Sequence, residues 1–478
     1  MTVDRVIRQD GAEVSLEQLS GEVSASLFQT DKHYALCAEV AGAQVTDEGV
    51  YKVLHNLLAL KSRVLMGLSA LLAEPELGLP PPRQVVLSPA LVRAVGQTLS
   101  ARGIEVVPLP QDTPLLPRSV AVAFFLKAVL HRLYRLVARP LLAGVPMVRA
   151  WVDVTDVMYG QLYERAQVRV FPFSHGMRRQ LAYVRSLGRR GVRWSFDGVP
   201  FRVADALAAL LAPGATRHLR LARAEWQAYD RFGRELLRAG VKELYSSDEY
   251  EVGAVAAGAR LRQGGAAYVN TAHGIGLYCP QVAYTRFEYI NDYQAAFYRR
   301  MGNPMALQKR EKMNSRLPFE RNELEQADPL ALVYVHQNFE AYNLPSERAA
   351  QDRIMGALSP LARSLGLQAV LKLHPNTPPA RFRADLPADV RVAGRWDELC
   401  GLRPVFLTIY STAYYELAPV APVLVYRAPT YSPQVYLDGE FQTFDVSDLA
   451  ERVAPLRDRA TWAALVDRQW QSLQGVPA

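Results

Sequence analysis

The sequence has little cysteine: three in 478 residues, Cys37, Cys279 and Cys400, with no two close together. That spacing argues against a disulfide framework and a structural zinc site, and it favours a reducing compartment. The chain also lacks any Asp-X-Asp pair, and none of its eight histidines lies four positions from another. We therefore expect chemistry that needs neither a metal ion nor another cofactor.

Three common catalytic signatures are missing as well. There is no Walker-type lysine loop, no G-x-G-x-x-G after a predicted strand and no G-x-S-x-G elbow. These absences argue against the enzyme classes that those motifs mark. The first residues mix acids and polar side chains with apolar ones, so no secretory signal is predicted and a cytoplasmic protein is expected.

The longest apolar stretch, residues 120–142, is broken by basic side chains well before it could span a bilayer. At about 100° per residue these basic side chains share one helical face: Lys127, His131, Arg132, Arg135 and Arg139. The other face is apolar: Phe125, Leu126, Val129, Leu133, Leu136 and Val137. Two interpretations stay open, a surface helix packed on its own domain and a basic helix in peripheral contact with the inner face of the cell membrane. The net charge of +8 favours anionic partners, although no nucleic acid is expected among them.

The composition is that of a folded protein, because half of the residues are hydrophobic and 21% are charged. A chain of this length exceeds a typical single core, so two domains are expected. We predict an N-terminal α/β domain over residues 1–310 and a C-terminal α/β domain over residues 311–478.

From Gln84 onward, short β-branched runs alternate with longer runs of helical period, which is typical of parallel sheets built from βαβ units. The predicted strands of the first domain are 85–87, 104–107, 148–152, 168–171, 192–196, 243–246 and 266–271. Predicted helices include 177–187, 203–211 and 249–262. Residues 286–328 are polar and lack a strong strand, so the passage between domains is placed there.

The second domain repeats the alternation, with strands at 330–336, 369–373, 390–392, 405–409 and 423–426 and a helix at 346–365. A last helix, 460–473, follows the final αβ unit and is free to pack back across to the first domain. Ligands of open parallel sheets bind beyond the carboxyl ends of the strands, so polar residues at strand ends are the candidates for function.

Two such strand ends lie in the second domain. His374-Pro375 follows one strand, where the proline prevents its continuation. Ser411-Thr412 follows another, and one of these hydroxyl residues is expected to be the N-cap of a helix. A helix N-terminus offers free N–H donors and a partial positive charge, so this pair of motifs predicts a phosphate site with an imidazole opposite.

Together, and in this order, the two motifs resemble those of bacterial glycosyltransferases of the two-domain GT-B type. The likeness is to sialyltransferases and polysialyltransferases, capsule polysaccharide transferases and CDP-glycerol glycerophosphotransferases, and it covers about residues 330–445. It implies two Rossmann-like domains whose parallel sheets face a central cleft, with residues 1–310 as the acceptor-binding domain and residues 311–478 as the nucleotide-donor-binding domain. It also implies that His374, Pro375, Ser411 and Thr412 hold the phosphate of a donor nucleotide.

The resemblance suggests two acids for the nucleotide ribose. Sialyltransferases of this type place a carboxylate between the two motifs, and Glu398 lies there in this sequence. Many GT-B enzymes use an acid on the helix after the second motif, which corresponds to Glu416. Glu398 is equally well explained as a turn-capping acid before Leu399, and Glu416 as a solvated helix residue.

Candidates for the general base lie in the first domain. His273-Gly274 ends a strand, and the related glycerophosphotransferases carry a similar His-Gly at the reaction centre. Asp197-Gly198 resembles the acidic motif of sialyltransferases, but phenylalanine stands where the motif has a first acid. His175 and Asp248 also follow strands and are candidates for binding the acceptor, although a surface turn for His175 and a helix cap for Asp248 are the favoured interpretations.

The resemblance thus implies an inverting, metal-independent glycosyltransferase that moves a sugar from a nucleotide to a hydroxyl of a surface polysaccharide or glycolipid. The sialyltransferases and the glycerophosphotransferases that this sequence resembles both use cytidine nucleotides. Cytidine is therefore the favoured nucleoside, and the favoured donor is a CMP-activated acidic sugar such as sialic acid or Kdo. The alternatives are a CDP-polyol phosphotransferase, a sugar-nucleotide epimerase and a non-catalytic scaffold of glycan assembly.

Overall fold

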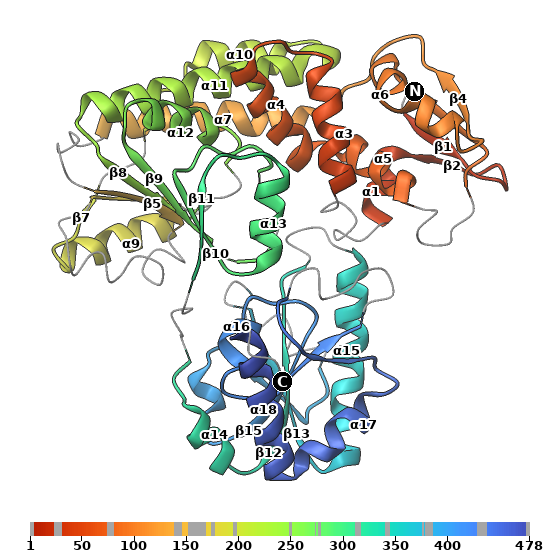
Figure 1. The fold of residues 1–478 in the computed structure, drawn as a ribbon, viewed down its shortest axis with the longest axis vertical. Helices are drawn as coiled ribbons and strands as arrows, with labels where there is room; N and C mark the ends of the chain where they lie inside the picture. The colour runs from red at the N-terminus through yellow and green to blue at the C-terminus, as the bar shows by residue number, and fades with distance from the viewer. Residues whose placement is uncertain are drawn as a thin grey trace. The chain divides into compact units, whose positions relative to one another are not determined.

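The computed structural model describes residues 4–22, 31–73, 81–137, 146–151, 169–173, 177–194, 198–247, 251–272, 274–275, 279–310, 317–339, 345–374, 377, 386–427 and 437–474. The chain divides into two compact units. The first contains residues 1–20, 27–290 and 294–310, and the second contains residues 311–478 with the short segments 21–26 and 291–293. Figure 1 colours the first unit from red to green and most of the second in blue.

The main sheet of the first unit has seven parallel strands in the order β11-β10-β9-β8-β5-β6-β7. The chain enters at β5, proceeds outward to β7, returns beside β5 with β8 and continues outward to β11. This reversal of direction is the doubly wound arrangement of Rossmann-like sheets. The strands are β5 (Met147–Trp151), β6 (Arg169–Phe173), β7 (Arg193–Trp194), β8 (Glu243–Ser246), β9 (Ala267–Thr271), β10 (Arg286–Tyr289) and β11 (Ala306–Lys309).

Long helices pack beside this sheet and on one another. Figure 1 shows α11 and α12 lying together over the strands, and α10 packs against both α7 and α11. The helices of this part are α7 (Arg118–Val137), α9 (Met177–Arg189), α10 (Val203–Leu211), α11 (Gly214–Arg238), α12 (Ala254–Gln263) and α13 (Asp292–Arg300). Among the described residues, no helix is long and apolar enough to cross a membrane.

Residues 286–309 correct one expectation, because this stretch forms β10 and β11 where a passage between domains was predicted. Phe287 is fully buried, but it is the only strongly apolar residue at the centre of β10. β11 is the last strand of the sheet and is mostly exposed. Edge strands need no buried face on both sides, so a polar sequence can form them.

A smaller sheet, in the order β2-β1-β3-β4, corrects a second expectation. The strands predicted at 85–87 and 104–107 pair in parallel, as expected, but outside the main sheet. They join β1, which runs antiparallel to β3 and sets the buried Val6 opposite Val85. The strands are β1 (Arg5–Ile7), β2 (Glu13–Ser15), β3 (Gln84–Leu87) and β4 (Glu105–Pro108). Nearby helices are α1 (Leu16–Glu22), α3 (Asp31–Gly42), α4 (Glu48–Lys61), α5 (Arg63–Ala73) and α6 (Pro89–Ser100).

The second unit is built on six parallel strands in the order β14-β13-β12-β15-β16-β17. Numbered from β12, this is 3-2-1-4-5-6, the strand order of the Rossmann fold. Every residue of β12 and β15 is buried, as expected for central strands covered on both faces. The strands are β12 (Leu330–Val335), β13 (Gln368–Lys372), β14 (Val390–Ala393), β15 (Arg403–Thr408), β16 (Val423–Tyr426) and β17 (Gln442–Phe444).

The last helix packs on the second unit's own sheet. The indole Nε1 of Trp462 donates to the carbonyl of Pro404, 2.9 Å away, and the Gln469 side chain bonds both backbone groups of Val423. The helices of this unit are α14 (Arg321–Gln326), α15 (Pro345–Leu365), η3 (Asp397–Leu399), α16 (Tyr414–Leu417), α17 (Leu449–Val453), η5 (Ala454–Arg457) and α18 (Arg459–Leu473). The expected class, two Rossmann-like α/β units on parallel sheets, is confirmed. The cleft between the sheets stays a prediction.

Candidate functional site

The strand order of the second unit singles out one end of its sheet. The chain runs outward from β12 through β13 to β14 and then returns to the other side of β12 with β15. The loops after β12 and β15 therefore leave in opposite directions and open a crevice between them, where ligands of doubly wound sheets bind. The residues at this point are His336 and Gln337 after β12, and Tyr410, Ser411 and Thr412 after β15.

Gln337 ties the two strand ends together. Its Nε2 donates to the carbonyl of Tyr410 at 2.5 Å, and its Oε1 accepts from the Tyr410 N–H at 3.3 Å. The N–H of Gln337 in turn donates to Oε1 of Gln351 on α15, at 3.0 Å. One side-chain amide thus satisfies both backbone groups of Tyr410 and fixes the start of the Ser411 loop. Sequence reasoning missed Gln337, although its position just after a buried strand was a usable signal.

The loop after β15 departs from the expected N-cap. The helix α16 has only four residues, and its N-cap is Ala413 instead of Ser411 or Thr412. Ser411 Oγ accepts from the Ala413 N–H at 3.2 Å, and the Ser411 carbonyl accepts from the Tyr414 N–H at 2.9 Å. The first amides of α16 are therefore used in successive turns. What this loop offers an anion is the half-buried hydroxyl side chains of Ser411 and Thr412.

His374 follows β13 on the other side of β12. His374 is half-buried. Its backbone carbonyl accepts a hydrogen bond from the Thr377 N–H at 2.9 Å, which closes the turn after the strand. Burial lowers the pKa of His374, and the neighbouring Lys372 lowers it further. The ring is therefore neutral at pH 7 and can donate one hydrogen bond from one nitrogen while it accepts at the other.

Lys372 is a second residue that sequence reasoning assigned no role. It is 3% exposed, and its ammonium donates to the carbonyls of Leu373 at 2.7 Å and Gly394 at 3.1 Å. It also lies over the Trp396 ring, 4.5 Å from the ring centroid. Burial lowers the pKa of Lys372 to about 8, against the opposing effect of Glu398. Lys372 thus joins the ends of β13 and β14 and places a positive charge beside His374.

The spacing of these groups follows from the sheet. Neighbouring strands are about 4.8 Å apart, so the ends of β13 and β15, on either side of β12, are separated by roughly 10 Å. His374 and Ser411 stand at these two ends. We therefore expect that one phosphate-bearing ligand can reach both residues.

The two proposed ribose acids differ in position. Glu398 lies in η3, after β14, and its Oε1 accepts from the Arg395 N–H at 2.9 Å, which is the turn-capping arrangement considered from the sequence. Glu416 lies in α16, directly after the Ser411 loop, and is half-exposed. Of the two acids, Glu416 is therefore the one next to the Ser411 loop. The ribose role of either acid stays a prediction.

The remaining predicted residues, Pro375, His273, Asp197, His175 and Asp248, lie outside the described residues. The elements next to two of them are described. β9 ends at Thr271 and β8 at Ser246, and these strands are neighbours in the first unit's sheet.

The first unit contains a buried ion cluster that the sequence did not reveal. Arg149 on β5 pairs with Glu251, and Lys127 on α7 pairs with Glu225 of α11 at 3.2 Å and with Glu251 at 3.5 Å. Burial alone would raise the pKa of Glu251, but Arg149 and Lys127 bring it down to about 2. For Glu225 burial prevails over Lys127, and the pKa is raised. Two cations and two acids are thus balanced where α7 and α11 meet β5.

A tight contact beside this cluster holds it in place. Tyr229 of α11 lies within cation–π range of Lys127, whose Nζ is 5.2 Å from the ring centroid. A Cβ added to Gly253 would come within 2.3 Å of the Tyr229 ring and 2.6 Å of the Glu225 carboxylate. Glycine is therefore required before α12 so that the chain can pass this close to α11.

The basic face predicted for α7 is accordingly corrected. Lys127 points inward to the cluster, His131 is 9% exposed and its Nδ1 accepts from the Val199 N–H at 3.2 Å. Arg135 bonds Glu235 of α11 at 2.7 Å. Three of the basic residues are thus used inside the unit, because acids on α11 and near α12 neutralise Lys127 and Arg135, and the Val199 backbone binds His131. Arg139 lies outside the described residues.

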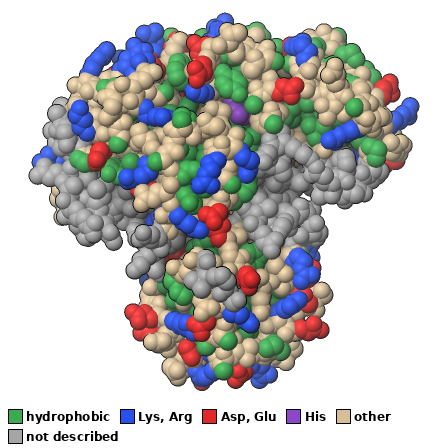
Figure 2. All heavy atoms as spheres, in the orientation of Figure 1, with side chains coloured by type: hydrophobic (Ala, Val, Ile, Leu, Met, Phe, Trp, Pro, Cys, Tyr) green, Lys and Arg blue, Asp and Glu red, His purple; other side chains and the backbone are tan. Residues whose placement is uncertain are grey.

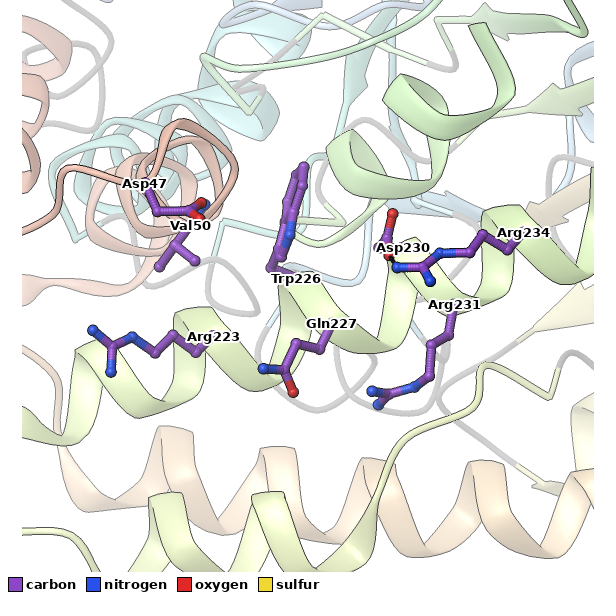
Figure 3. Close-up of a pocket in the computed structure, with 8 residues that line it drawn as sticks. All are labelled: Asp47, Val50, Arg223, Trp226, Gln227, Asp230, Arg231 and Arg234. Atoms are coloured by element: carbon purple, nitrogen blue, oxygen red, sulfur yellow. Dashed lines mark hydrogen bonds and ion pairs between the residues drawn. The ribbon is translucent and has the colours of Figure 1, made fainter. Parts of the chain in front are cut away.

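A separate hollow of about 460 Å³ lies between α4 and α11 of the first unit (Figure 3). It is lined by three arginines, Arg223, Arg231 and Arg234, with Trp226 and Gln227 between them. The acids at its wall are engaged: Asp230 pairs with Arg234 and Arg260, and Asp47 caps α4. This hollow is formed by outer helices, away from the strand ends, and we do not assign the nucleotide to it.

Comparison with known proteins gives limited likenesses. No family model and no curated protein matches the chain. Among solved structures, MurG of Acinetobacter baumannii is 12% identical over 69% of this chain and 97% of that chain, with a TM-score of 0.41. Anabaena HepE in complex with UDP is 11% identical over 69% and 95%, with a TM-score of 0.43. LpCGTa in complex with UDP is 10% identical over 70% and 96%, with a TM-score of 0.40. No side chain of the site is assigned from them.

Proposed function

We propose that the protein is a glycosyltransferase that binds a nucleotide-activated sugar at the carboxyl end of the second unit's sheet. The observation that carries this proposal is the 3-2-1-4-5-6 strand order with polar residues on both sides of β12. His374 stands after β13, and Ser411 and Thr412 stand after β15. In this proposal the imidazole and the hydroxyls bond the phosphate oxygens from opposite sides of the crevice.

The chemistry is a direct displacement at the sugar. An oxygen of the acceptor hydroxyl forms a bond to the anomeric carbon as the bond from that carbon to the phosphate oxygen breaks, which inverts the configuration. The acceptor's proton passes to a base on the first unit, for which His273 is proposed ahead of Asp197. Negative charge grows on the departing nucleotide, and His374, Ser411 and Thr412 stabilise it by hydrogen bonds.

The electrostatics of the site suit this role. His374 is neutral at pH 7, so it donates a hydrogen bond without a full charge of its own. The positive charge nearby belongs to Lys372, which two carbonyls hold in place. Phosphate charge can thus be balanced by protein groups, and we propose a reaction that needs no metal ion. Nucleotide affinity that survives a metal chelator is the expected result.

The donor is proposed to be a cytidine nucleotide carrying an acidic sugar, on the strength of the motif likeness, with a glycan or glycolipid acceptor. The test is a thermal-shift panel of CMP, CDP, UDP and GDP on the purified chain. One nucleotide should raise the melting temperature, and His374→Ala should weaken its binding by roughly tenfold or more, the cost of one hydrogen bond to a charged group. Arg395→Ala, on the exposed surface after β14, is the matched control and should bind like the wild type.

Four outcomes would separate the alternatives. Indifference to all four nucleotides would rule out the proposal and favour a scaffold. Preference for UDP, with the same loss of binding in His374→Ala, would support the glycosyltransferase proposal and change the nucleotide from cytidine to uridine. Binding with a changed sugar nucleotide as the only product would indicate an epimerase, and release of CMP from a CDP-polyol would indicate a phosphotransferase.

A further inference from the structure

Helix α7 of the first unit presents its apolar side to solvent. Five of its aliphatic side chains are exposed: Val122 by 41%, Leu126 by 60%, Leu130 by 37%, Leu133 by 54% and Leu136 by 72%. At about 100° per residue they fall within one sector of the helix. This is the reverse of an ordinary surface helix, which buries that sector.

The inward side of α7 explains the reversal. Lys127, His131 and Arg135 are spaced four residues apart and share the face opposite the leucines. Lys127 pairs with Glu225 and Arg135 with Glu235, both on α11. Turning the helix to bury the leucines would leave these acids without their partners, at a large cost for buried charges. These ion pairs, together with the buried Ala121, Phe124, Ala128 and Tyr134, set the rotation of α7, and its five exposed aliphatic side chains stay outside.

The neighbouring helix α10 continues the same surface. It packs against α7 and exposes Leu207 by 42% and Leu211 by 69%. Seven of the nine exposed large hydrophobic side chains among the described residues thus lie on these two adjacent helices. We name this surface, formed by Val122, Leu126, Leu130, Leu133, Leu136, Leu207 and Leu211, the leucine face. Exposed apolar residues scattered singly are ordinary, whereas a concentration such as this marks an interaction surface.

The charge around the leucine face identifies the partner. The whole of α7 contains no acid, and its flank carries the exposed Arg118 and Arg132. Neither arginine forms an ion pair with any residue that the structure describes. The seven exposed side chains that define the face are all aliphatic, whereas protein interfaces mix aromatic side chains and hydrogen-bonding groups into their cores. Leucines flanked by unpaired arginines match an anionic lipid surface, which accepts the apolar groups and neutralises the arginines.

We propose that the leucine face docks the first unit on an anionic bilayer, with its leucines among the acyl chains and Arg118 and Arg132 at the headgroups. This assignment differs from the docking expected from the sequence, which used the basic side of the same helix. It is independent of the proposed transfer reaction, because it involves none of the residues of the nucleotide site.

The test is co-sedimentation of the full chain with vesicles of phosphatidylcholine alone and of phosphatidylcholine mixed with phosphatidylglycerol. The wild type should bind the mixed vesicles. Leu126→Gln/Leu133→Gln should bind them at least about tenfold more weakly, since each leucine loses its burial in the membrane. Arg118→Gln/Arg132→Gln should lose most of the preference for the anionic vesicles. Leu181→Gln, at an exposed leucine of α9 outside the leucine face, is the control and should bind like the wild type.

These substitutions are on exposed positions, so the melting temperature should be unchanged or higher, and a melt of each variant checks this. Equal vesicle binding by the wild type and Leu126→Gln/Leu133→Gln would overturn the proposal, as would no binding by the wild type. A wild-type dimer in sedimentation velocity that Leu126→Gln/Leu133→Gln abolishes, together with no vesicle binding, would assign the face to a second copy of the chain instead.

Discussion

The two Rossmann-like units share a strand order but use ionisable side chains differently. In the first unit, Arg149 and Lys127 are paired with Glu225 and Glu251 between the sheet and its helices. In the second, β12 is apolar throughout, and Lys372 is held by carbonyls at the end of β13. The first arrangement secures packing, and the second leaves polar groups where a ligand can reach them. Position along the strand, more than residue type, separates the two roles.

The surface adds to the contrast. On the face drawn in Figure 2, acidic and basic side chains are interspersed over the second unit. Such mixed charge is typical of a solvated surface. The exposed aliphatic side chains of the described chain are concentrated on α7 and α10 of the first unit. The following predictions test the difference between the units, from the largest effect to the smallest.

Removing one cation of the buried cluster should have the largest effect. Arg149→Met leaves Glu251 buried with only Lys127 beside it, so the free energy of unfolding should fall by about 3–5 kcal/mol. Urea denaturation measures it. The double variant Arg149→Met/Glu251→Leu should recover much of the loss, because no unpaired acid remains. A single-variant loss below about 1 kcal/mol would show that the cluster does not hold the unit together.

Acid should weaken the first unit before the second. Burial lowers the pKa of His33, His55 and His218 to about 4, and all three lie in the first unit. In the unfolded chain these histidines become protonated as the pH falls below about 6.5, whereas in the folded chain they stay neutral until the pH approaches 4. Their stabilisation is therefore complete above pH 6.5 and is lost as the pH falls toward 4, by ~3 kcal/mol for His33 alone.

Hydrogen exchange followed by mass spectrometry at pH 7 and pH 5 measures this difference by peptide. Peptides of α3, α4 and α11 should lose protection at pH 5 while those of β12 and β15 keep it. His55 is the informative site, because its Nε2 donates to the Tyr34 carbonyl at 3.0 Å and its Nδ1 lies 3.2 Å from the Gln281 amide nitrogen. Loss of protection in both units together would contradict the prediction.

Loosening the crevice should have a smaller effect on stability than on ligand binding. Gln337→Ala removes both hydrogen bonds to Tyr410, at a cost of about 1–3 kcal/mol, and frees the Ser411 loop. At a temperature where the variant is fully folded, a loss of stability by itself does not change nucleotide affinity. We expect the affinity to fall even there, because the Ser411 loop is no longer fixed. Isothermal titration measures the affinity, and unchanged affinity would separate the loop from the nucleotide site.

An exposed ion pair should contribute least. Arg395 and Asp397 lie 2.8 Å apart after β14, with side chains 76% and 50% exposed. Arg395→Ala should change the free energy of unfolding by less than about 1 kcal/mol, and added salt should remove the difference. A loss as large as that of Arg149→Met would show that exposure does not distinguish the two kinds of pair.

Much of the second unit could be predicted from the sequence. The strand at 423–426 has the predicted bounds, as do β8 and α10 in the first unit. Apolar runs with clear turn residues at both ends determine such elements locally. The same pattern located His374 and Ser411 at strand ends, because a polar residue after a buried run marks the point where the strand leaves the core.

The sequence by itself thus determined which residues form strands and helices, and which side chains share a face. Only the tertiary structure decided that β3 and β4 belong to a small sheet, that β10 and the edge strand β11 form, and that α16 starts after Ala413. It also decided which face of α7 lies inward. Periodicity is symmetric between the two faces of a helix. Acids on α11, about 100 residues away along the chain, pair with Lys127 and Arg135 and turn the leucines outward.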